Sequence, residues 1–521
     1  MSEFCNLSES AWEDSGEDLH DECGVFGIWA PCRDVSRLTY FALRALQHRG
    51  QESAGIAVGD GKTVVVRKDL GLVSQVFSDA DLSAMSGKCS IGHVRYGTSG
   101  AKSWESAQPH LSTINDTIIA LAHNGTLVNS DELRDDLIRL GIPFRSNTDS
   151  EVAAQLIGYF TQQTHHLRQG IAHTMQMVEG GYAMTLVRDN ALYAFRDPNG
   201  IRPLVLGKLP AGPVDGEEPG WVIASETCAF DIIGAHYVRD VMPGEILRIS
   251  DEGISSEQGL PAAAPANCIF EDVYFSRPDS VKDGRSFYSV RYAMGRRLAQ
   301  EAPCDVDLII DVPDSGRPAA EGFAYELGVP YGEGLVKNRY VARTFIQPTQ
   351  SLRQMGVRLK LNPLTDNIEG KRICMVDDSI VRGTTSKQIV RMLREAGATE
   401  VHVRSASPTV VWPCFYGIDT GVQGQLIAAK KSIDEIQAFI EADSLAYLSV
   451  GGMLSCVPKN GYCSACFTGR YPVEIPDDFA REKFLEGFVP CNLSHPSEDT
   501  RAQIRSFNQA AQVAVHKGDA R

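Results

Sequence analysis

The chain has 521 residues and a formal net charge of −16, with 43% hydrophobic and 22% charged residues. This length exceeds what one hydrophobic core supports, so two or three domains are expected. The acidic balance argues against a nucleic-acid-binding protein, which normally presents a basic face. No apolar stretch approaches the length needed to cross a bilayer, so no membrane partner is expected.

Residues 1–22 have the composition of a removable propeptide. They contain eight carboxylates, no Lys or Arg, and no apolar central region, which favours disorder and excludes a secretory signal. Thirteen cysteines are scattered over the chain without the density of a disulfide-stapled secreted domain. We therefore expect free or metal-bound thiols in a reducing cytoplasm.

The segment 23–262 has the pattern of a layered α/β domain. Residues 23–29 predict a buried strand, and short β-branched segments predict further strands at 63–67, 90–93, 117–122 and 184–187. Helices are predicted over 148–163 and 168–178. A Pro/Ala-rich stretch at 260–265 predicts the linker to the next domain.

The segment 263–490 alternates strand, loop and helix. Predicted strands at 308–312 and 372–376 precede predicted helices at 318–327 and 386–397. This order is typical of parallel βαβ units, which bind ligands beyond the carboxyl ends of their strands. The tail, residues 491–521, carries a polar run and a short helical pattern that indicate no function.

The most specific segment is 376–386, Val-Asp-Asp-Ser-Ile-Val-Arg-Gly-Thr-Thr-Ser. A strand delivers Asp377 and Asp378, which suit ribose hydroxyls or Mg²⁺. Gly383 allows close backbone approach, and Thr384 and Thr385 open a helix whose N–H groups favour a phosphate. Either half alone could merely end a strand or cap a helix. Together they resemble the diphosphate-sugar signature of type I phosphoribosyltransferases.

Two further segments suit a diphosphate substrate. Residues 311–318, Asp-Val-Pro-Asp-Ser-Gly-Arg-Pro, predict a companion loop for the pyrophosphate before a Pro-started helix. Lys337, Arg339 and Arg343 place three cations within seven residues. A solvated charged loop is the simplest interpretation, and a lid that closes over a polyanion and excludes water is the functional one.

Cys23 is the candidate nucleophile of the first domain. A thiol is a weak nucleophile until a base removes its proton. Cleavage after Glu22 would give Cys23 an α-amine that titrates near about pH 8 and could accept that proton. The alternative is an ordinary buried strand cysteine.

Five segments, 23–28, 46–55, 92–99, 122–126 and 146–151, resemble class II glutamine amidotransferases in sequence and order. The resemblance implies an N-terminal-nucleophile αββα sandwich. It also implies that the Asn124 side chain and the Gly125 N–H form an oxyanion hole. Arg95 would bind the α-carboxylate of glutamine and Asp149 its α-ammonium. Arg95 could instead be a surface residue, and Asp149 could only favour a helix N-terminus, because Thr148-x-x-Glu151 is a capping box.

Together the two halves resemble the amidophosphoribosyltransferase family from Cys23 to about residue 475. The resemblance implies glutamine-dependent amination of phosphoribosyl pyrophosphate, the first committed step of purine synthesis. It further implies homotetramers, feedback by purine nucleotides and internal passage of ammonia. The implied Mg²⁺ positions are Ser315, Asp377 and Asp378. The implied phosphoribosyl contacts are Lys337, Arg339, Arg382, Gly383, Thr384 and Thr385. The rivals are an amidotransferase acting on another sugar phosphate and a regulatory sensor of the sugar diphosphate.

Four cysteines form a candidate cluster site. Cys463 and Cys466 make a C-x-x-C pair, and Cys268 and Cys414 lie in loop-like sequence. Four thiolates suit zinc or an iron–sulfur cluster, and a redox pair is a third option. By resemblance, the leader and the Tyr-Cys-x-x-Cys-Phe-Thr-Gly context match the family branch that has a leader and a [4Fe–4S] cluster. Cys304, Cys374 and Cys456 are assigned no role.

Overall fold

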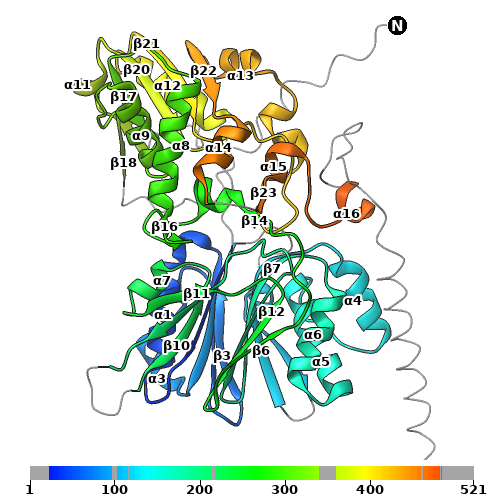
Figure 1. Ribbon diagram of the computed structural model, residues 1–521. Helices are drawn as coiled ribbons and strands as arrows, with labels where there is room; N and C mark the ends of the chain where they lie inside the picture. The colour runs from blue at the N-terminus through cyan, green and yellow to red at the C-terminus, as the bar shows by residue number, and fades with distance from the viewer. Residues whose placement is uncertain are drawn as a thin grey trace, which may run out of the picture.

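The structure is a computed structural model that describes residues 23–96, 103–114, 117–212, 218–338, 360–458, 461–481 and 483. The predicted propeptide, Arg339, most of the predicted lid and the tail 491–521 lie outside these residues. Figure 1 shows two bodies, a two-sheet sandwich and a smaller sheet with its helices. Among the described helices, none combines the length and apolar character that crossing a membrane requires.

The first half is built on two antiparallel sheets that pack face to face. One has seven strands in the order β11-β9-β10-β1-β4-β2-β3, and the other has six in the order β13-β12-β8-β7-β6-β5. Their bounds are β1 Gly24–Trp29, β2 Ser53–Gly59, β3 Val64–Leu70, β4 Cys89–Arg95, β5 His110–Ile114, β6 Thr117–Leu127, β7 Gly180–Arg188, β8 Ala191–Arg196, β9 Val205–Leu209, β10 Gly220–Ala224, β11 His236–Asp240, β12 Glu245–Ser250 and β13 Gly253–Gln258.

Helices cover both outer faces of this sandwich, which confirms the αββα architecture. On one side lie α1 (Val35–Ala45), α2 (Val73–Val76), α3 (Asp79–Ala84) and α7 (Cys228–Asp231), and on the other α4 (Ser130–Arg139), α5 (Asp149–Thr164) and α6 (Leu167–Met177). Strand β1 is buried on both faces for this reason. Phe26 and Ile28 pack in the core under α1, whereas Val25 and Trp29 pack between the sheets.

The second half contains a parallel four-stranded sheet in the order β17-β20-β21-β22, which confirms the predicted βαβ units. The strands are β17 Leu308–Asp311, β20 Arg372–Asp377, β21 Glu400–Ser405 and β22 Ser444–Tyr447. The helices are α8 Phe287–Glu301, α9 Arg317–Leu327, α11 Thr365–Ile368, α12 Thr384–Glu395, α13 Ile433–Ile440, α14 Val450–Cys456, α15 Ala465–Thr468 and α16 Asp477–Arg481. Short strands are β14 Asn267–Cys268, β15 Val281–Lys282, β16 Arg285–Ser286, β18 Leu335–Lys337, β19 Leu361–Pro363 and β23 Tyr462–Cys463.

The connection between the halves lies along the first half. The predicted linker 260–265 contains no helix or strand, but the Ala263 and Ala266 N–H groups donate to the carbonyls of Pro198 and Asn199, each at 2.8 Å. Strands β14 and β23 and helix α15 follow at the junction of the two bodies (Figure 1). The two candidate sites are therefore joined by ordered structure.

Candidate active sites

Cys23 lies directly before β1 and is half-buried. Its Sγ is 3.7 Å from the carbonyl oxygen of Tyr96, at the end of β4. β1 and β4 are antiparallel neighbours, and Gly24 is opposite Val94. The sheet thus places the thiol beside the carboxyl end of β4, where Arg95 also lies.

The two predicted oxyanion donors lie on β6, in the facing sheet. The His93 Nε2 atom of β4 is 3.0 Å from the carbonyl oxygen of His123, which connects the two sheets one residue before Asn124. Asn124 is 1% exposed, and neither its amide nitrogen nor its amide oxygen has a hydrogen-bond partner among the described residues. Such a group is costly to bury without a partner. Its free amide is therefore the strongest sign of a ligand site in this half.

Gly125 requires glycine for two reasons. Its φ is +139°, and a Cβ atom there would lie 2.0 Å from the carbonyl oxygen of Gly181 on β7. The backbone N–H of this residue is thus held in an orientation that L side chains rarely adopt. This is the kind of fixed backbone donor that an oxyanion hole uses.

Arg95 and Asp149 reach the same region from different elements. Arg95 is 6% exposed, so the surface interpretation of this residue is wrong. Asp149 begins α5, and its Oδ2 accepts from the Leu127 N–H at 3.0 Å, at the end of β6. Asp149 therefore contacts the strand that carries the predicted oxyanion donors as well as starting a helix.

The predicted capping box at the start of α5 is only half formed. The Thr148 hydroxyl accepts from the Glu151 N–H at 3.3 Å. The Glu151 carboxylate does not return to the Thr148 N–H, as the motif requires. It accepts instead from the N–H groups of Arg145 and Ser146, at 2.9 and 2.6 Å. The side chain thus fixes the loop before the helix.

A buried ion-pair network supports the Cys23 backbone. The Arg49 Nε donates to the carbonyl oxygen of Cys23 at 3.1 Å. The same guanidinium pairs with Glu226 at 2.6 Å and with Glu271 at 2.6 Å, and Glu271 pairs with Arg202 at 2.5 Å. Burial alone would raise the pKa of Glu226, but His48 and Arg49 lower it to about 2. These residues were missed by the sequence analysis, although Arg49 lies within the 46–55 segment.

In the second half, Asp377 is the last residue of β20 and Asp378 follows it, and both are buried. Gly383 has a φ of +75° and is the N-cap residue of α12, so Thr384 and Thr385 lie in the first turn as predicted. The helix begins at Thr384, two residues before the predicted start. The left-handed conformation of Gly383 turns the chain into the helix at this point. The acidic pair and the open helix N-terminus thus lie at the carboxyl edge of the parallel sheet, as expected for a phosphate site.

The predicted companion loop lies against the same edge. The Val312 N–H donates to the Val376 carbonyl at 3.0 Å, and a Cβ atom on Gly316 would lie 2.7 Å from that carbonyl oxygen. The loop that contains Ser315 therefore packs against Val376 of β20, the residue before Asp377. The Lys337 ammonium reaches Asp314 of this loop at 2.6 Å, and Arg382 donates to the Gln425 amide oxygen at 3.1 Å. Arg339 lies outside the described residues.

The four cysteines of the candidate cluster converge at the junction of the halves. Cys268 and Cys463 are opposite each other in the parallel pair β14–β23. The pKa of the Cys466 thiol is raised well above its usual value, first by burial and then by Cys463, Cys268 and Cys414. None of the four forms a disulfide with another described cysteine. Over the described ranges, however, no three His, Cys, Asp or Glu side chains are arranged as a metal-binding group.

Comparison with known proteins decides the family. A model described as a glutamine amidotransferase domain matches residues 93–230. The amidophosphoribosyltransferase of Synechococcus elongatus is 52% identical over 467 residues, which cover 89% of this chain and 94% of that protein. The Bacillus subtilis amidophosphoribosyltransferase is 48% identical over 470 residues, which cover 88% of this chain and 96% of that protein. The chain belongs to the amidophosphoribosyltransferase family. It is therefore an enzyme.

Solved structures of amidophosphoribosyltransferases have the same two-domain fold. The glutamine phosphoribosylpyrophosphate amidotransferase from B. subtilis, complexed with ADP and GMP, matches with a TM-score of 0.80 and 47% identity, covering 88% of this chain and 98% of that one. A structure described as the allosteric regulatory enzyme of purine biosynthesis matches with a TM-score of 0.81 and 46% identity. The match covers 89% of this chain and 100% of that one.

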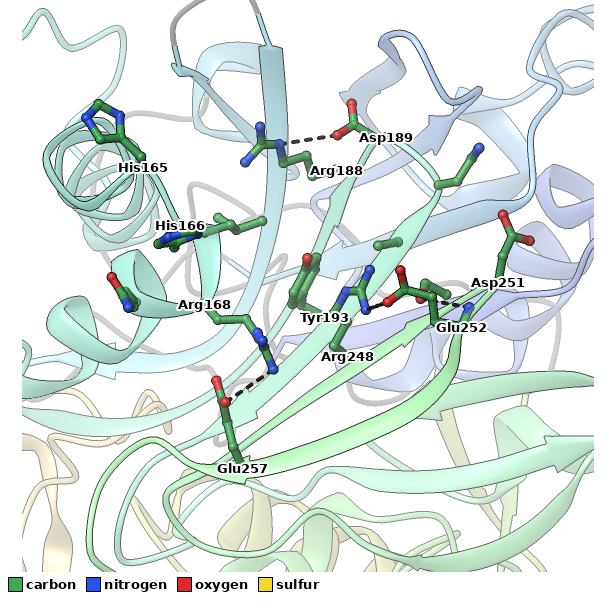
Figure 2. Close-up of a pocket in the computed structure, with 15 residues that line it drawn as sticks. His165, His166, Arg168, Arg188, Asp189, Tyr193, Arg248, Asp251, Glu252 and Glu257 are labelled. Atoms are coloured by element: carbon green, nitrogen blue, oxygen red, sulfur yellow. Dashed lines mark hydrogen bonds and ion pairs between the residues drawn. The ribbon is translucent and has the colours of Figure 1, made fainter.

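A surface pocket of about 720 Å³ lies away from both amidophosphoribosyltransferase sites, between the start of α6 and strands β7, β8, β12 and β13. Its three arginines are paired with carboxylates, Arg168 with Glu257, Arg188 with Asp189 and Arg248 with Glu252 (Figure 2). Along β7, Tyr182 pairs with Gly125, and Arg188 is six residues further, or about 20 Å. The pocket is thus neither a free anion site nor part of the predicted glutaminase active site.

Proposed function

We propose that this chain transfers the amide nitrogen of glutamine to phosphoribosyl pyrophosphate, forming phosphoribosylamine, glutamate and pyrophosphate. This is the first committed step of purine nucleotide synthesis. The unpartnered Asn124 amide in the half that carries Cys23 supports a glutaminase. The acidic pair and helix N-terminus 250 residues later support a phosphoribosyl site. The names of the relatives describe the same combination.

The glutaminase step begins at Cys23. With the propeptide removed, the α-amine takes the thiol proton, and Sγ attacks the amide carbon of glutamine. The Asn124 amide and the Gly125 N–H stabilise the resulting oxyanion, while Arg95 and Asp149 bind the α-carboxylate and α-ammonium. The α-ammonium of Cys23 returns this proton to the departing nitrogen, which leaves as ammonia, and water then releases glutamate from the thioester.

The phosphoribosyl step uses that ammonia as the nucleophile at the anomeric carbon. The α12 N-terminus, with Thr384 and Thr385, binds the 5-phosphate, and the loop containing Ser315 receives the pyrophosphate. Lys337, Arg339 and Arg382 balance the substrate charge. Ser315, Asp377 and Asp378 offer the oxygen ligands that Mg²⁺ prefers, and the ion would neutralise the departing pyrophosphate. Ammonia passing internally would avoid loss to solvent.

The cysteine site is proposed to hold a [4Fe–4S] cluster. Cys268, Cys414, Cys463 and Cys466 supply four soft ligands from three segments, and the Tyr416 N–H donates to the Cys414 Sγ at 3.4 Å, a contact that stabilises thiolates. The four thiols lie near one another, but among the described residues their geometry is not that of a metal-binding group. The cluster would supply a crosslink between β14, α15 and the loop at Cys414.

We also propose how the chain is processed, assembled and regulated. Residues 1–22 form the propeptide, 23–262 the glutaminase, 263–490 the phosphoribosyltransferase domain and 491–521 a tail. Purine nucleotides act as feedback inhibitors, which the ADP and GMP bound to the B. subtilis relative support. The assembly is a cytoplasmic homotetramer.

The deciding experiment is Cys23→Ala in the full chain. We expect loss of glutamine-dependent phosphoribosylamine formation, with ammonia-dependent formation retained, because only the first site uses the thiol. Intact mass of the anaerobically purified wild-type protein would check that the chain begins at Cys23 and carries four iron and four sulfide.

Each alternative gives a different result in this experiment. A sensor of the sugar diphosphate would show neither activity. An amidotransferase for another sugar phosphate would hydrolyse glutamine and leave phosphoribosyl pyrophosphate unchanged. Retained glutamine-dependent activity in Cys23→Ala would exclude the assigned nucleophile.

A further inference from the structure

The loop that carries Cys414 belongs to the second half of the chain, yet it reaches the glutaminase. Gly417 in this loop packs against Gly125. A methyl group built on Gly417 would lie 3.1 Å from the Gly125 Cα atom and 3.5 Å from Arg202. The two glycines are almost 300 residues apart in sequence, and each has a positive φ, +124° and +139°.

The preceding residue contacts the neighbouring strand in the same way. Gly181 of β7 is the residue whose carbonyl oxygen leaves no room for a Cβ atom on Gly125. A methyl group built on Gly181 would lie 3.0 Å from the Tyr416 Cβ atom. The residues Tyr416 and Gly417 therefore cover the backbone of β6 and β7 where the oxyanion donor lies. A side chain at position 417 would have to displace that backbone, since close-packed interiors do not absorb an added methyl without a shift.

The loop itself is held firmly. The Tyr416 hydroxyl donates to the Val473 carbonyl at 2.5 Å, and the Cys414 N–H donates to the Thr420 hydroxyl at 2.8 Å. Arg202, which is fully buried, donates to the Tyr416 carbonyl at 3.4 Å. These bonds come from both halves of the chain, so the loop is a fixed support on which Gly125 rests.

We propose that Gly417 is a positioning residue of the glutaminase, supplied by the second half of the chain, and that it keeps the Gly125 N–H aimed at the developing oxyanion. The inference rests on the proposed glutaminase function. It assigns no contact between Gly417 and substrate, because Gly417 acts through Gly125. An oxyanion donor moved by a few tenths of an ångström loses transition-state stabilisation while glutamine binding by Arg95 and Asp149 continues.

The test is Gly417→Ala in the full chain, with glutamine-dependent and ammonia-dependent formation of phosphoribosylamine measured side by side. Loss of an oxyanion donor costs about 100- to 1,000-fold in kcat, and a displaced donor should cost a part of this, at least about tenfold. We expect this loss in kcat for glutamine, with KM for glutamine within about twofold and the ammonia-dependent rate retained.

The matched control is Gly253→Ala. Gly253 also has a positive φ, +96°, but a methyl group there meets nothing within 4 Å. The Gly253→Ala variant therefore measures the effect of placing alanine at a positive φ, without a steric contact between the new methyl group and a neighbouring atom. We expect unchanged kcat for glutamine in this variant.

The outcomes separate the inference from the proposed function. Unchanged kcat for glutamine in Gly417→Ala, or an equal fall in both activities of a soluble protein, would overturn the inference and leave the glutaminase assignment intact. If Gly417→Ala yields no soluble protein, Tyr416→Phe decides, because it loosens the same turn without adding an atom. A fall in kcat for glutamine alone supports the inference, and any other result rejects it.

Discussion

At the scale of single residues, buried histidines connect the two sheets of the glutaminase. His93 is completely buried, and desolvation lowers the pKa of its imidazole to about 3. It therefore stays neutral in the folded protein, where its Nε2 meets the His123 carbonyl. The contact lies one residue before Asn124, the proposed oxyanion donor, so burial of this imidazole bears on both the stability of the fold and the position of that residue.

This burial predicts a pH dependence. The unfolded chain binds a proton at His93 below about pH 6.5, whereas the folded chain does not until about pH 3, so the free energy of unfolding falls as the pH drops through this window. Between pH 7 and pH 5 the loss from this one residue is about 2 kcal/mol. In His93→Gln, which retains a donor, urea unfolding at the two pH values should show a difference smaller by that amount. If the free energy of unfolding depended on pH identically in the variant and the wild type, the lowered pKa of His93 would not be the cause of the pH dependence.

The sequence predicted those site residues that lie within short motifs. Asn124 and Gly125 are adjacent, and Asp377 and Asp378 follow one strand, so local pattern and family resemblance located them. Gly417 could not be found in this way, because its partner Gly125 is distant in sequence and only the folded chain brings them together. The same holds for Arg49 and Glu271, whose pairing depends on the packing of one half against the other.

At the scale of elements, the β20–turn–α12 unit carries most of the proposed phosphoribosyl site. The strand ends at the buried Asp377, the buried Asp378 follows it, and the helix begins after Gly383. The Ser379 hydroxyl donates to Asp378 at 2.7 Å, which fixes that carboxylate before any ligand arrives. The unit thus holds its acidic groups and the proposed phosphate-binding helix N-terminus in one arrangement.

Asp378→Asn tests this unit. A hydrogen bond involving a charged group is worth about 1.5–3 kcal/mol, so kcat/KM for phosphoribosyl pyrophosphate should fall by roughly 10- to 100-fold. Glutamate release by the glutaminase half should persist. Steady-state kinetics with ammonia as the nitrogen donor would measure the effect directly. The control is Asp305→Asn, an exposed partner of Arg372; if it causes a similar loss, the effect is not specific to the site.

Element boundaries show where local pattern stops being informative. The β-branched run 117–122 predicted a strand, but β6 continues to Leu127. The extension His123–Leu127 is polar and contains glycine, and neither property favours a strand. It is a strand because it pairs with Gly180–Met184 of β7. The functional end of β6 is therefore set by its neighbour, which local propensity does not report.

At the scale of the whole molecule, the two halves share a buried charge network. Arg49 and Arg202 belong to the first half and Glu271 to the second, and all three are at most 2% exposed. Glu271 also accepts from the Ser276 hydroxyl at 2.6 Å. The predicted boundary at residues 262 and 263 thus separates two units that are joined by buried ion pairs of Arg49 and Arg202 with Glu271.

This network predicts how the molecule unfolds. Glu271→Gln leaves two buried guanidinium groups short of one negative charge, and breaking a buried pair in this way costs about 3–5 kcal/mol. We expect the free energy of unfolding of the variant, measured in urea, to fall by this amount. We expect the wild-type halves to unfold in one transition, because buried ion pairs join Arg49 and Arg202 of the first half to Glu271 of the second. The exposed pair of Arg248 with Glu252 serves as the control, since Glu252→Gln should change the free energy of unfolding by less than about 1 kcal/mol. Two separate wild-type transitions, or a Glu271→Gln effect no larger than that control, would show that the halves are energetically independent.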